Sequence, residues 1–190
     1  MTLLILDRDG VINQDSDTYI RTLAEWIPIP GSIKAIAHLS RAGFRVAIAT
    51  NQSGLSRGFF TLDTLEEIHA KLLELVEGEG GTIAGIFYCP HLPQERCRCR
   101  KPATGLIEAM ETELGETAKG AYFVGDSLKD LQAALASGCQ PVLVKTGKGK
   151  DTLAQLTAEH QPELADLAQL RKIPVYANLL AASQAILAPG

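Results

Sequence analysis

The chain has 190 residues, of which 46% are hydrophobic and 21% are charged, and its formal net charge is -4. That length suits one domain with a buried core, so we expect a single domain over residues 1–190. The composition excludes collagen-like, disordered and membrane-spanning chains, and the mild acidity argues against nucleic acid as a partner.

The first predicted strand is the apolar run "LLIL" at residues 3–6. No charged segment precedes it and acidic residues follow at once, so the N-terminus lacks the pattern of a signal peptide. No uninterrupted apolar run approaches the roughly 18 residues that a membrane span needs. We therefore expect a cytoplasmic protein with no membrane partner. In the cytoplasm, clustered thiols are more often metal ligands than disulfides.

Short apolar runs alternate with segments of helical period along the chain. The runs predict strands at residues 3–6, 44–50, 85–89, 121–125 and 141–146. The helical period predicts helices at residues 31–43, 61–81, 105–114 and 128–137, the second of them with Thr61 as its N-cap. Strands that are apolar on both faces suit a parallel sheet covered by helices. The order of elements therefore predicts a doubly wound, Rossmann-like α/β domain.

Beyond Lys150 the pattern is weaker. It predicts a helical stretch rich in Ala, Leu and Glu, and then an edge strand and a terminal helix within residues 172–187. No internal repeat, low-complexity tract or linker separates this part from the rest, so we expect it to complete the same domain.

Polar residues follow the predicted strands, and in an open α/β sheet the ligand site lies at the carboxyl ends of the strands. Asp7 and Asp9 follow the first strand, with Gly10 permitting a tight turn. Two carboxylates at this spacing can act as a nucleophile and as a general acid and base. Asp and Gly are also common in surface turns, so the pair alone leaves both interpretations open.

The second strand is followed by a polar loop. Thr50 and Ser53 offer hydroxyls, and Asn51 and Gln52 offer amides, all of which can bind an anion. Arg57 lies close behind and could reach a phosphate or remain in solvent. An ordinary polar loop would have the same composition.

The third and fourth strands are also followed by charged residues. Arg100 and Lys101 precede Pro102, which suits the first position of a helix. Asp126 and Asp130 lie at the start of the next predicted helix, where they could bind a hard cation such as Mg2+ or act as ordinary caps.

Three of the four cysteines lie in one short segment, "YCPHLPQERCRCRKP" at residues 88–102. Cys89, His91, Cys97 and Cys99 form a set of sulfur and nitrogen ligands that suits tetrahedral Zn2+, although free or redox-active thiols remain an alternative. A site with four protein ligands is structural. Cys139 is expected to be a small buried apolar residue.

Taken together, these strand ends resemble the haloacid dehalogenase superfamily of phosphohydrolases. The matching motifs are "DRDG", the Thr of "ATNQSG", the Lys of "CRKP" and "GDSLKD", in the order and spacing of that family. The resemblance covers about residues 3–146 and implies a Rossmann-like core. The interval between Asp9 and Thr50 is too short for an inserted cap domain, so we expect a capless enzyme with a zinc-binding loop.

The resemblance also implies catalytic roles. Asp7 would attack phosphorus and form an aspartyl-phosphate, and Asp9 would protonate the leaving alkoxide. Asp7, the Asp9 carbonyl and Asp126 would hold a catalytic Mg2+. Thr50 and Lys101 would balance the charge of the transferring phosphate.

Within the superfamily, "LDRDGVIN", "TNQSG", "YCPH" and "CRCRKP" resemble the D-glycero-D-manno-heptose 1,7-bisphosphate 7-phosphatases. That resemblance implies a sugar bisphosphate substrate, a place in nucleotide-activated heptose and lipopolysaccharide synthesis, and a role for Arg100 in substrate recognition. We expect a monomer. The loops expected to contact substrate contain the residues Asp15, Tyr19, Asn51, Gln52, Ser53 and Arg57.

Histidinol-phosphate phosphatases share the same motifs and a similar zinc loop, so they are the nearest alternative. Their substrate carries an ammonium group and an imidazole, which would favour contacts with Asp15 and Asp17, whereas Arg57 and Arg100 favour a bisphosphate. A zinc-stabilised binding module would lack a catalytic residue, and none is missing here. A phosphatase for DNA 3′ ends would need a basic groove, of which the sequence gives no sign.

Overall fold

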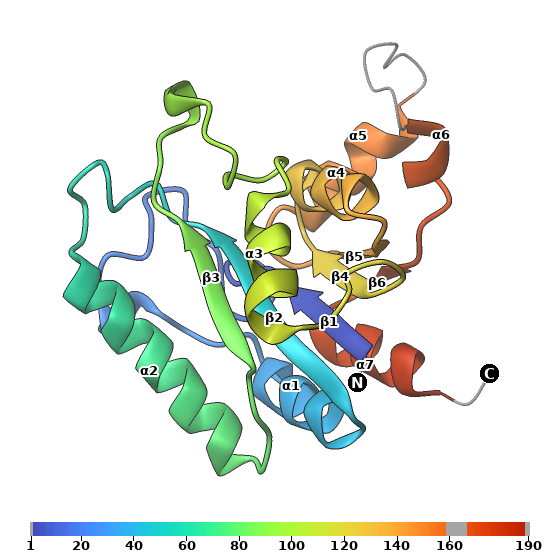
Figure 1. The fold of residues 1–190 in the computed structure, drawn as a ribbon, viewed down its shortest axis with the longest axis horizontal. Coiled ribbons are helices and arrows are strands. Elements are labelled where there is room, and N and C mark those ends of the chain that lie inside the picture. The colour runs from blue at the N-terminus through green and yellow to red at the C-terminus, as the bar shows by residue number, and fades with distance from the viewer. Residues whose placement is uncertain (1, 159–166, 189–190) are drawn as a thin grey trace.

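The computed structural model describes residues 2–158 and 167–188, which form an α/β fold around one parallel sheet (Figure 1). The six strands lie in the order β3-β2-β1-β4-β5-β6, with every adjacent pair parallel. This order confirms the predicted doubly wound sheet, and it places β1 between β2 and β4. The strands are β1 (Thr2–Leu6), β2 (Phe44–Asn51), β3 (Gly85–Cys89), β4 (Tyr122–Gly125), β5 (Gln140–Val144) and β6 (Val175–Tyr176).

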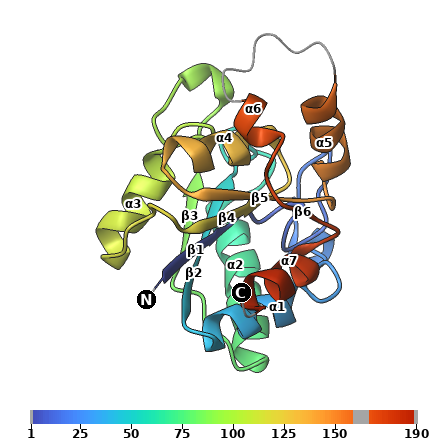
Figure 2. The ribbon, with the colours of Figure 1, turned by 90° about the vertical axis from the view of Figure 1, so that its right-hand side faces the viewer.

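Helices cover both faces of the sheet. They are α1 (Ser32–Arg41), α2 (Leu62–Gly78), α3 (Gly105–Leu114), α4 (Leu128–Ala136), α5 (Gly149–Thr157), α6 (Leu167–Leu170) and α7 (Leu179–Leu187), with 3-10 turns η1 (Leu23–Glu25) and η2 (Pro93–Glu95). Figure 2 shows α3 and α4 on one side of the sheet and α1, α2 and α7 on the other.

The central strand is buried on both faces, as its apolar sequence predicts. Leu4 and Leu6 pack into the core beneath α1, α2 and α7, whereas Leu3 and Ile5 pack toward α3 and α4. Side chains alternate between the two faces of a strand, so four consecutive apolar residues supply both cores. The catalytic candidates begin at the next residue, Asp7, where the chain leaves this rigid centre.

The predicted elements are confirmed, with boundaries that differ by a few residues. Thr61 caps α2, because its hydroxyl accepts a hydrogen bond from the Thr64 backbone N–H at 3.2 Å. The C-terminal edge strand and helix are present as β6 and α7. The predicted helical stretch after Lys150 is found in part as α5 and α6, and its residues 159–166 lie outside the described part of the chain.

The prediction that Pro102 begins a helix is wrong. Helix α3 begins three residues later, at Gly105, and Pro102 lies in a turn after a cis peptide bond with Lys101. The side-chain amide of Asn51 bonds both the N–H and the carbonyl of Lys101, at 3.0 and 3.1 Å. This tertiary contact holds the backbone of the turn that precedes α3.

Within residues 2–158 and 167–188, no helix has the length and apolar character needed to cross a membrane.

Candidate active site

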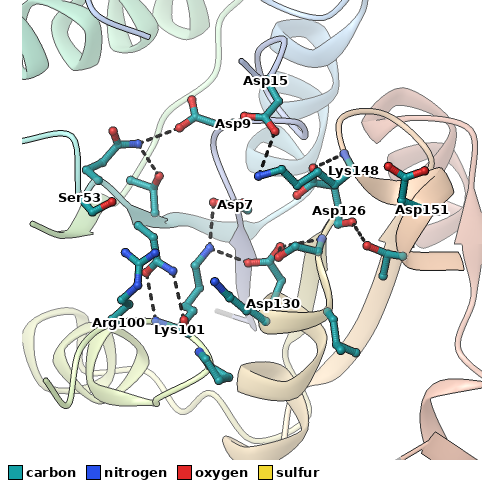
Figure 3. Close-up of a pocket in the computed structure, with 18 of the residues that line it drawn as sticks. Asp7, Asp9, Asp15, Ser53, Arg100, Lys101, Asp126, Asp130, Lys148 and Asp151 are labelled. Atoms are coloured by element: carbon teal, nitrogen blue, oxygen red, sulfur yellow. Dashed lines mark hydrogen bonds and ion pairs between the residues drawn. The ribbon is translucent and has the colours of Figure 1, made fainter. Parts of the chain in front are cut away.

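The predicted catalytic residues meet at the carboxyl ends of β1, β2 and β4, around a pocket of about 800 Å³ (Figure 3). Because these strands are neighbours in a parallel sheet, their ends open on the same edge. The predicted residues that line the pocket are Asp7, Asp9, Asp15, Tyr19, Thr50, Asn51, Gln52, Ser53, Arg100, Lys101 and Asp126.

Lys101 lies at the centre of the charge arrangement. Its Nζ lies 2.8 Å from Asp7 Oδ1 and 2.6 Å from Asp130 Oδ1, and it donates a hydrogen bond of 2.7 Å to the Ala49 carbonyl. Burial opposes the charged form, but the two carboxylates outweigh it and raise the pKa of Lys101. The contacts with Asp7 and Asp130 together hold the ammonium group of Lys101 in place.

Asp7, Asp126 and Asp130 form a compact acidic group, with one oxygen from each within 4.8 Å of the others. Burial, with repulsion from Asp130, raises the pKa of Asp7 to about 7, although Lys101 acts in the opposite direction. Burial and the charges of Asp7 and Asp130 raise the pKa of Asp126 to about 8. Three carboxylates at this spacing repel one another, so a hard cation bound by their oxygens fits the site.

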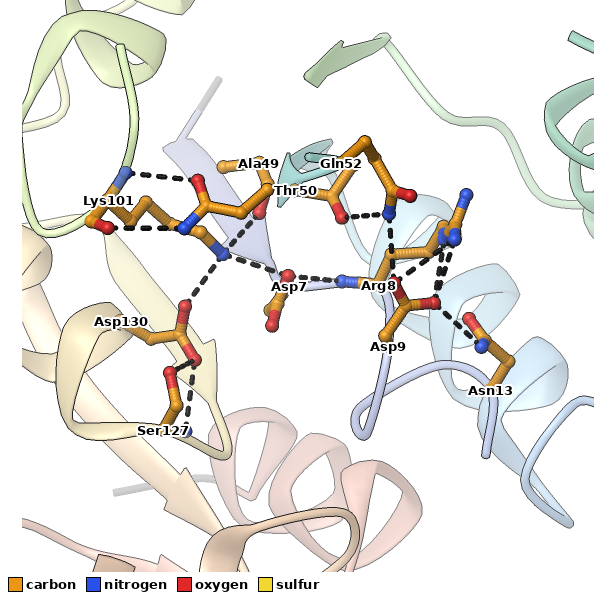
Figure 4. A network of polar contacts seen from close by, with 11 residues as sticks. Asp7, Arg8, Asp9, Asn13, Ala49, Thr50, Gln52, Lys101, Ser127 and Asp130 are labelled. Atoms are coloured by element: carbon orange, nitrogen blue, oxygen red, sulfur yellow. Dashed lines mark hydrogen bonds and ion pairs between the residues drawn. The ribbon is translucent and has the colours of Figure 1, made fainter. Parts of the chain in front are cut away.

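Asp9 lies in a different environment from Asp7 (Figure 4). Its oxygens accept hydrogen bonds from Arg8, from Asn13 Nδ2 at 2.9 Å and from Gln52 Nε2 at 2.8 Å. Burial alone would raise the pKa of Asp9, but Arg8 and these hydrogen bonds lower it below its usual value. The two aspartates, two residues apart, therefore differ in proton affinity because their surroundings differ.

Two of the residues predicted to bind substrate use their side chains within the protein. Gln52 donates to both Asp9 and Thr50, each at 2.8 Å, which engages both of its amide hydrogens. The Asn51 side-chain amide donates to the Lys101 carbonyl and accepts from the Lys101 backbone N–H. Arg57 is exposed and is not among the residues that line the pocket.

The rim of the pocket contains two lysines that were not among the residues predicted from the sequence. Lys129 and Lys148 line the same pocket as Arg100. Partial burial, together with the charges of Arg100 and Lys148, lowers the pKa of Lys129. Lys129 lies inside the quoted motif "GDSLKD", so its position was a signal for it, whereas Lys148 follows β5, a strand for which no motif was quoted.

Lys148 also connects two loops across the pocket. Its Nζ lies 3.4 Å from Asp15 Oδ2, and its backbone N–H donates to Asp126 Oδ2 at 2.7 Å. The loop after β5 thereby contacts both the loop after β1 and the end of β4.

The cysteine cluster spans the last residue of β3 and the loop that follows it. The side-chain ligand atoms of Cys89, His91, Cys97 and Cys99 lie within 4.8 Å of one another, and the pairs in closest contact are 3.0–3.6 Å apart. Sulfur ligands of a tetrahedral Zn2+ lie about 3.8 Å apart, so the cluster has the size and donor set of a zinc site. The loop also holds Arg100, whose N–H donates to Cys97 Sγ at 3.3 Å and whose Nη1 donates to the His91 carbonyl at 3.3 Å.

Comparison with known proteins agrees with this arrangement. A family model described as "HAD-hyrolase-like" matches residues 98–170. The D-glycero-beta-D-manno-heptose-1,7-bisphosphate 7-phosphatase of Pseudomonas putida is 56% identical over 172 residues, which cover 90% of this chain and 98% of that protein. The enzyme of the same name from Neisseria meningitidis is 49% identical over 187 residues, 98% of this chain and 95% of that protein.

Two solved structures are also similar. The D,D-heptose 1,7-bisphosphate phosphatase of Bordetella bronchiseptica, crystallised with magnesium and phosphate, is 44% identical with a TM-score of 0.88 and covers 98% of each chain. The phosphatase of the same name from Burkholderia thailandensis is 34% identical with a TM-score of 0.72 and covers 100% of each chain.

The fold and the site define a haloacid dehalogenase-like phosphomonoester hydrolase. Within that class, the chain belongs to the family of D-glycero-beta-D-manno-heptose-1,7-bisphosphate 7-phosphatases.

Proposed function

We propose that this chain removes the 7-phosphate of D-glycero-D-manno-heptose 1,7-bisphosphate through an aspartyl-phosphate on Asp7. The observation that supports this reaction best is the placement of Asp7 against Lys101 at the end of β1, with Oδ1 and Nζ 2.8 Å apart. Names of close relatives specify the β form of the sugar, so we propose the β anomer as the preferred substrate. The product would be a heptose 1-phosphate for nucleotide activation.

Asp7 would act as the nucleophile and Asp9 as the proton donor. In the first step an Asp7 oxygen bonds to phosphorus and the bond from phosphorus to the sugar oxygen breaks. Asp9, whose low pKa in the free protein means that it takes up a proton from solvent before this step, gives that proton to the sugar oxygen. In the second step Asp9 takes a proton from water, which attacks phosphorus and frees Asp7. A carboxylate and a phosphate dianion repel each other, so attack requires positive charge already in place. Lys101 supplies that charge, and the Thr50 hydroxyl can donate to a phosphate oxygen.

The acidic group fits Mg2+. Both oxygens of Asp130 are engaged, one by Lys101 and one by Ser127 at 2.7–3.0 Å. Asp7 and Asp126, with the backbone carbonyl of Asp9, are therefore the residues that would hold the ion. Bound Mg2+ would offset the charge of the carboxylates and of the phosphate. The similar Bordetella bronchiseptica phosphatase was crystallised with magnesium and phosphate, which supports this choice of metal.

The retained 1-phosphate would be bound by the basic residues of the rim. Arg100, Lys129 and Lys148 line the pocket, and their mutual repulsion is reduced when an anion binds among them. No hydrogen bond or ion pair within residues 2–158 and 167–188 engages the ammonium group of Lys129, which leaves it available. Asp15 is already paired with Lys148, which counts against it as a site for the ammonium group of histidinol phosphate.

We further propose that Cys89, His91, Cys97 and Cys99 bind a structural Zn2+. The ion would fix the loop that holds Arg100, and it would take no part in the chemistry because all four positions are occupied by protein ligands.

The proposal is tested by phosphate release in the presence and absence of Mg2+ from the α and β heptose 1,7-bisphosphates and from histidinol phosphate. We expect the highest kcat/KM for the β bisphosphate, strict dependence on Mg2+, and no turnover by Asp7→Asn. Faster turnover of histidinol phosphate would identify the alternative function. Activity retained in Asp7→Asn would exclude the covalent mechanism.

A further inference from the structure

Arg8 is a fully buried charged residue that the proposed chemistry does not use. It lies between the two catalytic candidates in sequence, and its side chain has an exposure of 0%. Figure 4 shows Lys101 and Asp130 on one side of Asp7, and Arg8 with Asp9 and Asn13 on the other. Since burial of an unpaired guanidinium is costly, the partners of Arg8 indicate what it does.

Two nitrogens on one edge of the Arg8 guanidinium are bound to Asp9. Nε donates to Oδ1 at 3.0 Å, and Nη2 donates to Oδ2 at 3.1 Å. Such a bidentate pair fixes the orientation of a carboxylate as well as its position. Asn13 and Gln52 add one hydrogen bond to each oxygen, so the Asp9 carboxylate is held in a single orientation.

The remaining Arg8 nitrogen, Nη1, lies 3.2 Å from Nε2 of His69 in the middle of α2. A guanidinium only donates hydrogen bonds, so Nε2 must accept and the imidazole must carry its proton on Nδ1. Burial and the charge of Arg8 lower the pKa of His69 to about 4, which agrees with a neutral ring. The ring also lies against Tyr88 of β3, with 6.1 Å between the ring centroids.

We propose that His69 is a positioning residue for proton transfer: as the neutral Nδ1–H tautomer it holds Arg8, and Arg8 holds the Asp9 carboxylate. This inference rests on the proposed function, because it takes Asp9 as the proton donor to the leaving oxygen. It adds a residue on α2 to the machinery of the site, at a point in the sequence that no motif singled out.

The chemistry of the leaving group separates this role from a structural one. When phosphorus bonds to Asp7, the oxygen of a sugar leaves as a strongly basic alkoxide and needs the proton of Asp9. The oxygen of p-nitrophenyl phosphate leaves as a weakly basic phenolate and needs it far less. A misplaced Asp9 therefore slows the sugar phosphate much more than the aryl phosphate.

A matched pair of variants tests the contact. In His69→Gln the side-chain amide reaches the place of Nε2 and can accept from Arg8, whereas the amide of His69→Asn is one methylene too short. Both variants lose the ring that packs against Tyr88. We expect His69→Asn to lower kcat for the heptose bisphosphate by about tenfold or more, within the range of general acid catalysis, with little change in KM. Its kcat for p-nitrophenyl phosphate should change by less than about twofold, and His69→Gln should stay near wild type on both substrates.

Equal losses in the two variants, or equal losses on the two substrates, would overturn the inference. The nitrogen resonances of the His69 ring in the wild-type protein provide a test that needs no variant to fold. They should show Nε2 without a proton and Nδ1 with one at neutral pH, and the reverse tautomer would also overturn the inference. Failure of the wild type to hydrolyse the heptose bisphosphate would instead count against the proposed function. The two failures can be told apart, because the nitrogen resonances report on the contact between His69 and Arg8 and do not depend on the substrate.

Discussion

Lys101 is the residue on which the charge balance of the site depends. Its ammonium group has three hydrogens, and three oxygens receive them: those of Asp7, Asp130 and the Ala49 carbonyl. A buried ammonium without partners loses its proton easily, so these contacts hold Lys101 in the charged form. The same charge limits the repulsion among the carboxylates around it, which allows several acids to share one pocket.

His69 should make the stability of the folded protein depend on pH. Its pKa falls from 6.5 to about 4 on folding, because of burial and the charge of Arg8, which outweigh the opposing effect of Asp9. Between these values the unfolded chain binds a proton that the native chain does not. Stability from this residue is therefore fully present above pH 6.5 and is lost as pH falls toward 4, by about 1 to 3 kcal/mol.

Urea unfolding of the wild type and of His69→Gln at about pH 7, above 6.5, and at about pH 4.5, near the lower value, measures this loss. The wild type should lose more stability than the variant on acidification. His38→Gln, on the exposed face of α1, is the control and should follow the wild type. Parallel curves for wild type and His69→Gln would contradict the prediction.

At the scale of elements, the loop between β3 and α3 joins the cysteine cluster to the pocket. Cys89 is the last residue of β3 and is buried, so it anchors the loop to the sheet. Arg100 is hydrogen-bonded to Cys97 and His91, and Lys101 follows it directly. The position of two basic residues at the pocket therefore depends on a loop with little apolar core of its own.

We predict that Cys97→Ala abolishes zinc binding and lowers both thermal stability and kcat/KM. Removal of one of four ligands opens the site, and the loss of a structural zinc removes the folding free energy that it supplies. Metal analysis of the purified protein and the thermal midpoint measure these effects. Cys139→Ala, in a buried position outside the set of four ligands, should keep its zinc. Full zinc content in Cys97→Ala would show that the cluster is not the zinc site.

The elements themselves could be predicted because hydrophobic period is a local property of the chain. The strands and the helices through α4 follow it, and Thr61 was recognisable as a cap. The start of α3 at Gly105 also follows the helical period, whereas the turn around Pro102 was not predictable, because it depends on hydrogen bonds between Asn51 and Lys101, two residues far apart in sequence. The contacts of the Asn51 amide with Lys101 and of the Gln52 amide with Asp9 also join residues far apart in sequence, so the sequence did not show them.

At the scale of the molecule, the sequence motifs led to the candidate catalytic residues only because the fold family is known. Periodicity does not determine which strand lies beside which, and the order β3-β2-β1-β4-β5-β6 is what joins Asp7, Thr50 and Asp126. Arg8 lies inside the quoted motif "DRDG" but was not singled out, and His69 lies in no quoted motif, since their contact is made only when α2 packs on the sheet. The single domain, the monomeric state and the cytoplasmic location stay predictions.

The same strand order brings three loops into close contact around Asp126. Gly10, after β1, has a φ of +85°, and a Cβ there would lie 2.1 Å from Asp126 Oδ2 and 3.2 Å from the Cα of Gly147, which follows β5. The backbones after β1 and β5 thus enclose the carboxylate at the end of β4. A side chain at Gly10 would displace a residue proposed to hold Mg2+.

Gly10→Ala should therefore damage both the fold and the chemistry. Gly43, which ends α1, is the matched control, because its φ is +95° and a Cβ there would meet nothing within 4 Å. Gly43→Ala should cost about 1 to 2 kcal/mol of stability for its backbone conformation alone and should keep its kcat/KM. Gly10→Ala should cost roughly 1 to 3 kcal/mol more from overpacking and lower kcat/KM by about a hundredfold. Urea unfolding and phosphate release measure the two effects. Equal losses of stability and of kcat/KM in the two variants would mean that the loops around Asp126 can move apart to accept a side chain, which would contradict the prediction.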